Sequence, residues 1–334
     1  MILVCGGAGY VGSHMVRTLA AHGETPVVID NFRTGYKAAI HPKAQFIEGD
    51  IRNRDALDGI FSQFPIDSVI HFAASTQVGE SVQKPLEYLN NNVIGMQILL
   101  EAMAAHSVGN LVFSSSAAVY GDPKAIPITE DAAHCPTSPY GETKRVMEEM
   151  MRWVGPAHNI AFASLRYFNV AGAIEDGSLG EAHSPESHLI PLILQVPLGQ
   201  RSHITVFGDD YDTPDGTCIR DYIHVEDLAE AHLLALQYLK DGGRSDAFNL
   251  GNGEGFSVKE VITTAEAVVK KAIPQQIEGR RAGDPARLVA SAAKAEAVLG
   301  WKPSRSSLQN IIQTAWKWHS THPHGYDREI PASN

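Results

Sequence analysis

The sequence predicts an α/β protein built on a doubly wound parallel sheet, with a second, smaller lobe after residue 172. Short apolar segments at 1–5, 25–30, 46–49, 68–73 and 111–113 alternate with segments of helical periodicity such as 92–106. This alternation is typical of a parallel sheet with helices on both faces. The alternation breaks after Gly172, where loops rich in Gly, Pro and His cover 174–185, so we expect the second lobe to carry much of the substrate-binding surface.

A glycine-rich turn follows the first apolar segment directly. Gly6, Gly9 and Gly12 have the spacing Gly-x-x-Gly-x-x-Gly and precede a helix-like run at 13–21. Glycines permit a tight turn and let the backbone approach a pyrophosphate, which then lies at the helix N-terminus. The motif alone is a weak signal, but the strand before it and the helix after it supply the required context. The first lobe is therefore predicted to have a Rossmann-type fold that binds a dinucleotide.

The second apolar segment ends in an acidic residue. Asp30 lies 18 residues after Gly12, where a carboxylate would accept hydrogen bonds from the adenosine ribose. It would repel a 2′-phosphate, so NAD is favoured over NADP. Ligands of such sheets bind at the carboxyl ends of the strands, and Asp50, Ala73 and Ser116 also fall at predicted strand ends.

Tyr140 and Lys144 are four residues apart and should share one face of a helix. Ser138 can cap that helix, and Pro139 suits its first position. A phenol titrates near ~10, and a nearby ammonium lowers that pKa, so the tyrosine could exchange a proton with an alcohol. The alternative is a half-buried tyrosine beside a surface lysine, which the dinucleotide motifs disfavour.

Composition limits the classes of partner and compartment. The net charge of −11 argues against nucleic acid and anionic membranes as partners. No segment has the length of a membrane span, and no signal peptide is expected because the first strand begins at residue 1. The three cysteines are too far apart for a disulfide framework or a metal pair, which favours the cytoplasm.

The fifteen histidines give no metal-binding pattern in the sequence. None belongs to a His-Glu-x-x-His pair or a His/Cys cluster, so no metal site is expected. The histidines His14, His71, His106, His183, His188 and His224 are expected to be scattered over different elements. The loop 251–255 resembles a second phosphate cradle only superficially, because it lacks the lysine of a P-loop.

Further motifs run through the whole chain. They are Gly-Gly-Ala-Gly-Tyr-Val-Gly-Ser-His (6–14), Val-Ile-His-Phe-Ala (69–73), Val-Gly-Glu-Ser-Val (78–82), Lys-Pro-Leu-Glu-Tyr (84–88), Phe-Ser-Ser-Ser-Ala-Ala-Val-Tyr-Gly (113–121), Ser-Pro-Tyr-Gly-Glu-Thr-Lys (138–144), Arg-Tyr-Phe-Asn (166–169), Arg-Asp-Tyr-Ile-His-Val (220–225) and Arg-Arg-Ala-Gly-Asp (280–284). Together they resemble the extended short-chain dehydrogenase/reductase superfamily and, within it, the UDP-glucose 4-epimerase family. The first two motifs mark the superfamily, and the later ones are more specific.

The resemblance implies a catalytic cycle that interconverts UDP-galactose and UDP-glucose, as in galactose metabolism. Tyr140 would be the acid/base at the sugar 4-hydroxyl, and Ser116 would hydrogen-bond that hydroxyl and relay the proton. Lys144 would lower the pKa of Tyr140 and hold the nicotinamide ribose. The C4 hydride would pass to NAD and return to the other face of a 4-keto sugar, so NAD should stay tightly bound.

The resemblance also implies two sets of binding residues and a homodimer, formed through the outer faces of helices 92–106 and 140–154. Cofactor contacts are expected from Gly6, Gly9, Tyr10, Val11, Gly12, Asp30, Asn31, Asp50, Ile51, Phe72, Ala73, Asn92, Ser114, Tyr140, Lys144 and Tyr167. Substrate contacts are expected from Ser116, Tyr140, Asn169, His188, Leu189, Phe207, Arg220, Arg281, Asp284 and Leu288.

The chain departs from its relatives at four positions. Thr76 replaces a lysine that touches the cofactor phosphates in some epimerases, Ala118 replaces a threonine, and His188 replaces an asparagine that faces the uridine diphosphate. Leu288 lies where a tyrosine excludes a 2-acetamido group, so we expect UDP-GlcNAc and UDP-GalNAc to be accepted as well. The alternatives without a functional role are that His188 is a loop residue without contacts and that Leu288 only packs against the pocket wall.

Two other functions were weighed. A nucleotide-sugar dehydratase or oxidoreductase of the same superfamily is disfavoured, because dehydratases carry an Asp-Glu pair where this chain has Ala117 and Ala118. A non-catalytic NAD-binding sensor is disfavoured because Tyr140, Lys144 and Ser116 are all present.

The expected domains are 1–172 for NAD, with 220–250 returning to it as a strand and a helix, and 173–334 for the substrate. Pro191 and Pro197 should limit any helix in 189–198.

Overall fold

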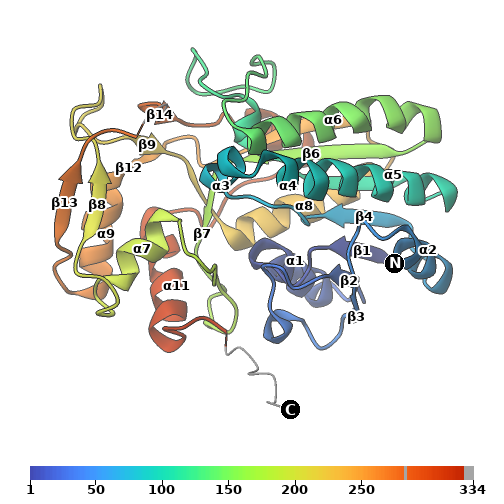
Figure 1. Cartoon of the computed structure of the whole chain (residues 1–334), viewed down its shortest axis with the longest axis horizontal. Helices are drawn as coiled ribbons and strands as arrows, with labels where there is room; N and C mark the ends of the chain where they lie inside the picture. Colours follow the sequence, from blue (N-terminus) through green and yellow to red (C-terminus); the bar gives the residue numbers. More distant parts are fainter. Residues whose placement is uncertain (282–283, 327–334) are drawn as a thin grey trace.

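The computed structural model describes residues 1–281 and 284–326 and has two lobes (Figure 1). The larger lobe is built on a seven-stranded parallel sheet with the order β11-β6-β5-β4-β1-β2-β3. The prediction of a Rossmann-type doubly wound sheet is confirmed. Its strands are β1 (Ile2–Cys5), β2 (Val27–Asp30), β3 (Gln45–Glu48), β4 (Ser68–His71), β5 (Asn110–Ser114), β6 (Ala161–Tyr167) and β11 (Asp246–Leu250).

Helices cover both faces of this sheet, which explains why its strands are continuous apolar runs. Along β1, Ile2 and Val4 belong to one buried core, whereas Leu3 and Cys5 belong to the other. Helices α1 and α8 contact each other on the first face, and α2, α5 and α6 contribute to the second core. The helices are α1 (Tyr10–Ala21), α2 (Arg54–Gln63), α3 (Val78–Gln83), α4 (Pro85–Tyr88), α5 (Gly95–Ala105), α6 (Pro139–His158) and α8 (Val225–Lys240), with short turns η1 (Lys37–Ala39) and η3 (Ala117–Val119).

The smaller lobe gathers around a third core and lies at the other end of the molecule (Figure 1). Strands β8 and β13 pair in parallel, and β12, β9 and β14 form a separate three-stranded sheet. The elements are α7 (Leu189–Gln195), β8 (Ile204–Phe207), β9 (Ile219–Arg220), β12 (Phe256–Ser257), α9 (Val258–Val269), β13 (Gln275–Glu278), β14 (Arg287–Leu288) and α11 (Leu308–Thr321). Helix α10 (Ala293–Leu299) instead packs on β11 and α8 of the larger lobe.

Two helices differ from their sequence patterns for local reasons. The run 92–106 does not start as a regular α-helix, because Leu89–Ile94 (η2) forms a π-helical segment before α5. Such segments are frequent at functional sites. Helix α7 forms although Pro191 lies within it, since the first turn of a helix has no intrahelical partner for that N–H.

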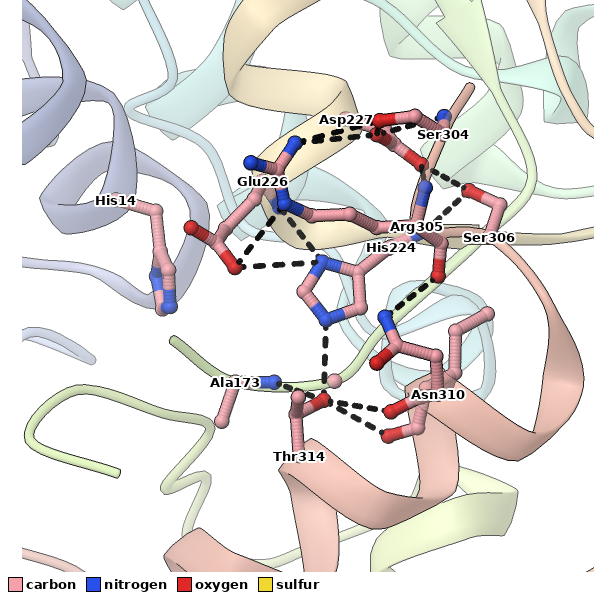
Figure 2. Close-up of polar contacts among 12 residues, drawn as sticks. His14, Ala173, His224, Glu226, Asp227, Ser304, Arg305, Ser306, Asn310 and Thr314 are labelled. Atoms are coloured by element: carbon pink, nitrogen blue, oxygen red, sulfur yellow. Dashed lines mark hydrogen bonds and ion pairs between the residues drawn. The ribbon is translucent and has the colours of Figure 1, made fainter. Parts of the chain in front are cut away.

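The junction of the lobes contains a buried polar network centred on His224 (Figure 2). β10 (Tyr222–His224) pairs with β7 (Asn169–Ala171), and the His224 ring caps α8 by accepting a hydrogen bond from the Glu226 amide at 3.1 Å. Its Nε2 lies 3.0 Å from the Thr314 hydroxyl of α11. The Asp227 carboxylate accepts from the Arg305 amide at 2.8 Å and from the Ser306 hydroxyl at 2.7 Å. The C-terminal helix is thereby fixed to the sheet lobe.

Candidate active site

A cavity of about 1030 Å³ lies between the lobes, at the carboxyl ends of the central strands. Residues of both lobes line it, as expected for a ligand site in this fold. The predicted site residues that line it are Gly6, Gly9, Tyr10, Val11, Gly12, Asp30, Asn31, Asp50, Ile51, Phe72, Ala73, Ser114, Ser116, Tyr140, Lys144, Tyr167, Asn169, His188, Arg220, Arg281, Asp284 and Leu288.

The three glycines of the first turn have different structural requirements. Gly6 has a φ of +82°, and a Cβ there would lie 2.7 Å from the Ala73 amide nitrogen. A Cβ on Gly12 would lie 2.1 Å from the Gly6 carbonyl, so helix α1 could not pack on the turn. A Cβ on Gly9 would meet only the Gly6 carbonyl, at 3.4 Å, which is an ordinary contact. Gly9 is thus free of protein contacts that demand glycine and leaves its backbone open to a pyrophosphate.

Two carboxylates border the adenosine end of the cavity. Asp30 accepts hydrogen bonds from the amides of Ala8 at 3.0 Å and Phe32 at 2.8 Å, which fix its orientation, and burial raises its pKa. Asp50 accepts from the Asn31 side chain at 2.9 Å and is paired with Arg52, which holds the pKa of Asp50 well below its usual range. The carboxylate acceptors at this edge and the open Gly9 backbone fit an NAD whose ribose carries free hydroxyls.

Tyr140, Lys144 and Ser116 come together on the same wall of the cavity. Ser138 caps α6 by accepting from the Gly141 amide at 3.1 Å, and Pro139 occupies the first turn, as predicted. The Lys144 ammonium donates to the Ser114 carbonyl at 2.7 Å and lies 5.9 Å from the Tyr140 ring centroid. The Ser116 hydroxyl also acts on Tyr140, since it lowers the pKa of the phenol. These three groups can therefore serve one proton-transfer position.

The acidity of this group differs from the sequence expectation. Burial raises the pKa of Tyr140, and the hydrogen bond with Ser116 offsets part of that rise, whereas Lys144 is not among the causes of the shift. Burial also lowers the pKa of Lys144 to about 7, and the Glu148 carboxylate counteracts it. The net shift of the Tyr140 pKa is therefore upward because the phenol is buried, and the lowering by Lys144 stays a prediction.

A buried ion pair that sequence patterns do not reveal supports Lys144. Glu148 lies one helical turn after Lys144 and accepts from the Arg166 guanidinium at 3.0 Å and from the Ser115 hydroxyl at 2.5 Å. Arg166 also donates to the Tyr120 hydroxyl at 2.8 Å. The spacing of Lys144 and Glu148, four residues apart, can be read from the sequence. The pairing of Glu148 with Arg166 on β6 cannot, because the two residues are 18 positions apart.

Asn92 has a different place from the one expected. It is fully buried and is not among the described residues that line the cavity. Its side-chain oxygen accepts from the Ser75 amide at 2.8 Å, and its amide group donates to the Ser75 carbonyl and the Thr143 hydroxyl, both at 3.0 Å. Asn92 therefore braces the loop after β4 against helix α6, and both segments line the cavity beside it.

The substrate end of the cavity carries two arginines. Arg220 is ion-paired with Asp284, and the Arg281 guanidinium stacks on the Phe207 ring at 3.9 Å. Phe207 and Leu189 are not among the described lining residues, so Phe207 acts through Arg281. Ala282 and Gly283 of the motif 280–284 lie outside the described residues. Leu288 lines the cavity and also packs against the buried cluster of Ala117, Val119, Tyr120 and Ile128.

His188 is not a loop residue without contacts. Its Nδ1 lies 2.8 Å from Glu181 and 2.9 Å from Glu186, and His183 Nδ1 lies 2.9 Å from Glu181. Burial lowers the pKa of His188, but these two carboxylates overcome it and raise the pKa to about 11. The expectation that the histidines are scattered is wrong for this pair, since His183 and His188 form a compact group with two glutamates.

Sequence motifs missed several further lining residues. Arg33, Thr34, Gln77 and Glu181 also face the cavity, and Ala117, Ala118 and Thr76 line it with side chains that carry no charge. The first four belong to loops or strand ends whose positions depend on tertiary packing, so no local pattern marked them. None of the helices in residues 1–281 and 284–326 combines the length and apolar character needed to cross a bilayer.

Comparison with known proteins places this site in context. The model of the NAD dependent epimerase/dehydratase family matches residues 2–251. A UDP-glucose 4-epimerase of Halalkalibacterium halodurans is 54% identical over 98% of this chain and 98% of its own length. A crystal structure of a UDP-glucose 4-epimerase is 53% identical, superposes with a TM-score of 0.96 and covers 98% of this chain and 99% of its own. The Bifidobacterium longum UDP-glucose 4-epimerase, solved in complex with NAD+ and UDP, is 39% identical with a TM-score of 0.91 and covers 97% and 99%.

Proposed function

The chain belongs to the NAD dependent epimerase/dehydratase family, and from that premise we propose that Tyr140, Ser116 and Lys144 are its catalytic residues. The chain is an NAD-dependent enzyme that catalyses the 4-epimerisation of UDP-glucose, an isomerase reaction of nucleotide-sugar metabolism. The observation that carries the residue assignment is that the three side chains line the same cavity as the dinucleotide turn, with the Lys144 ammonium 5.9 Å from the Tyr140 ring centroid.

The proposed cycle begins with the sugar 4-hydroxyl at Tyr140 and Ser116. The ionised phenolate of Tyr140 takes the hydroxyl proton as the C4 hydride leaves, and Ser116 holds the oxygen that becomes a carbonyl. NAD, held at the Gly6–Gly12 turn, would supply the acceptor for that hydride and the donor for its return. Tyr140 then gives the proton back to the oxygen, so the two half-reactions need no external acid or base.

Proton removal at Tyr140 requires compensation for its raised pKa. Lys144 is 2% exposed, and its ammonium is held by the Ser114 carbonyl at a fixed distance from the Tyr140 ring. A protonated Lys144 stabilises the phenolate once it forms, and we propose that the lysine also holds the nicotinamide ribose. We therefore assign Lys144 to transition-state stabilisation.

We propose that the diphosphate is anchored by Arg220 and Arg281. Their planar guanidinium groups suit phosphate oxygens, and the Phe207 ring orients Arg281. Because the diphosphate is held at a distance from the reacting carbon, the keto sugar can rotate and present its other face without leaving the site. Asn169, His188 and Asp284 complete the proposed substrate contacts. The proposed cofactor contacts are completed by Asn31, Asp50, Ile51, Phe72, Ala73, Ser114 and Tyr167.

We propose that the pocket also accepts 2-acetamido sugars. Leu288 lines the cavity wall, and its side chain is smaller than tyrosine and has no hydroxyl. Dehydration of the sugar is not supported, because Ala117 and Ala118 line the cavity where an acid and a base would be needed.

Three further features are proposed. Residues 1–172 with 220–250 form the NAD domain and 173–334 the substrate domain, which the pairing of β11 with β6 supports. Helices α5 and α6 form a homodimer contact, supported by the 67% exposed Trp153 and by an apolar groove of about 530 Å³ between them, lined by Leu100, Met150 and Val154. A reducing cytoplasm suits the free Cys5, Cys135 and Cys218.

The catalytic assignment is tested with Tyr140→Phe. The variant should lose most turnover, by about 100-fold or more, because the phenylalanine cannot move a proton. It should keep bound NAD and a normal melting temperature, because the ring still fills its site. Turnover within a few fold of the unsubstituted chain would contradict the role of Tyr140. Loss of NAD as well would mean that the tyrosine acts mainly in cofactor binding.

A further inference from the structure

Four metal-ligating side chains converge in the segment that precedes helix α7. Glu181, His183, Glu186 and His188 each offer one ligand atom, and these atoms all lie within 4.8 Å of one another. In the described part of the chain this is the single group of its kind. The residues lie within an eight-residue segment, so their convergence is a property of one loop and not of the sheet.

The separations match those around a small cation. Glu181 Oε1 lies 2.9 Å from His183 Nδ1 and 2.8 Å from His188 Nδ1, and Glu186 lies 2.9 Å from His188 Nδ1 and 3.8 Å from His183 Nδ1. Tetrahedral zinc holds nitrogen and oxygen ligands at about 2.0–2.2 Å, which puts the ligands about 3.4 Å apart. Small side-chain shifts would place all four around one ion.

The charge of the group calls for a cation. Glu181 is 3% exposed, and its side chain meets the two histidines; no lysine or arginine pairs with it among the described residues. Glu186 adds a second carboxylate within the same group. A buried carboxylate is stable when it is paired or when it coordinates a metal. A dication would neutralise both carboxylates beside a pocket that admits a diphosphate.

The scaffold around the group is fixed by the C-terminal part of the chain. The Trp318 indole donates to the Glu181 carbonyl at 2.8 Å, and the Tyr326 hydroxyl donates to the Gly180 carbonyl at 3.1 Å. A Cβ on Gly180 would lie 2.3 Å from the Trp318 ring, so the loop packs flat on that ring. The edge of the Tyr10 ring, at the start of α1, lies against His183 with centroids 6.2 Å apart. A preformed loop lowers the cost of assembling a coordination sphere.

We propose that Glu181, His183, Glu186 and His188 bind one zinc ion that fixes the pocket wall formed by this loop. Two imidazole nitrogens with carboxylate oxygens are a ligand set that zinc accepts. The role is structural, because Tyr140, Ser116 and Lys144 are not among the ligands. Glu181, His183 and His188 also line the cavity, so the ion would hold them in place for the substrate. The inference does not depend on the reaction assigned to the cavity.

The test measures metal content of the untagged chain. The chain is stripped with chelator, given one equivalent of zinc, gel-filtered in metal-free buffer and analysed by elemental mass spectrometry. We expect about one zinc per chain and a melting temperature raised by about 3 °C or more relative to the stripped chain. The variants His183→Gln and Glu186→Gln, both at half-buried positions, should bind below about 0.2 zinc per chain. His203→Gln, a half-buried histidine outside the group, should bind as the unsubstituted chain does.

Cobalt gives a second readout that a folding defect cannot imitate. Tetrahedral Co²⁺ in the zinc site should give strong visible absorption, which is lost in His183→Gln while the circular dichroism spectrum is unchanged. Zinc content below about 0.1 per chain with no change in melting temperature would overturn the proposal and leave the group as histidine–carboxylate ion pairs. Equal zinc content in both cluster variants and the unsubstituted chain would overturn it too, because the metal would then lie elsewhere.

Discussion

The Glu148 carboxylate accepts a hydrogen bond from the Arg166 guanidinium at 3.0 Å, in the protein interior and one helical turn from Lys144. This pairing matters for catalysis because Glu148 opposes the effect of burial on the pKa of Lys144. The carboxylate is therefore a positioning and tuning group for a lysine that faces the cavity, while it does not itself line that cavity among the described residues.

Glu148→Gln is expected to move the pH dependence of turnover. Burial lowers the pKa of Lys144 to about 7, and without the carboxylate it falls further. Since a protonated Lys144 stabilises the Tyr140 phenolate, the alkaline limb of kcat against pH should shift to lower pH. Glu149→Gln, on the exposed side of the same helix, should leave the profile unchanged. If Glu148→Gln folds poorly, Glu148→Asp keeps the charge and should keep the profile; an unshifted profile in a folded Glu148→Gln variant would contradict the tuning role.

His71 is expected to make stability depend on pH. It is 1% exposed, its ring stacks on Phe113, and neither ring nitrogen has a partner in the described part of the chain. Burial lowers its pKa from 6.5 to about 3, with Lys144 adding to the effect. Between these values the unfolded chain binds more protons than the folded one. The stability contribution is therefore fully present above pH 6.5 and is lost as pH falls, at about 1.4 kcal/mol per pH unit.

The measurement is urea unfolding of the unsubstituted chain and His71→Leu at several pH values from 7.5 to about 4.5. The stability difference between them should shift in favour of the variant as pH falls below 6.5. A difference that stays constant with pH would mean that His71 titrates with an ordinary pKa in the folded chain. His22→Leu, an exposed control, should show no such trend.

Leu288→Tyr tests the size of the sugar pocket. The tyrosine ring would occupy space beside the cavity that a 2-acetamido group needs. Turnover of UDP-GalNAc should fall by about tenfold or more, while turnover of UDP-Gal should change by less than about threefold. Leu288→Ile keeps the volume and should preserve both activities. Equal losses for both sugars in Leu288→Tyr would argue for a packing role against the Val119 and Tyr120 cluster instead.

Ala104→Glu tests the proposed dimer. Ala104 lies in the apolar groove between α5 and α6, where a carboxylate would be buried by a partner helix. Sedimentation velocity at micromolar protein should give the mass of two chains for the unsubstituted protein and of one chain for the variant. Gln275→Glu, on the exposed strand β13 of the other lobe, should remain dimeric. A single-chain mass for the unsubstituted protein would refute the contact.

The fold could be predicted because its main signals are local. The strands of the large sheet are apolar on both faces, and Gly6 and Gly12 are required by contacts within a few residues or with the next strand end. The acidic residue at the cofactor site could also be predicted locally, since Asp30 is the last residue of its strand. The proximity of Tyr140 and Lys144 could be predicted because residues four apart on a helix lie on the same face.

The rest of the site depends on packing between distant segments. The role of Asn92 rests on contacts with Ser75 and Thr143, which are 17 and 51 residues away. The sign of the Tyr140 pKa shift depends on how deeply both groups are buried, which a four-residue spacing does not reveal. The Glu181 group matches neither a His-Glu-x-x-His pair nor a His/Cys cluster, because its four residues alternate glutamate and histidine over one loop.

Product analysis without added NAD decides whether this chain is an epimerase that retains its cofactor. The purified chain is incubated with UDP-Gal alone, and the products are separated by chromatography. We predict conversion to UDP-glucose with no net change in NADH, because the hydride returns to the same carbon. Accumulation of a keto sugar or of NADH, or no conversion even after NAD is added, would contradict it.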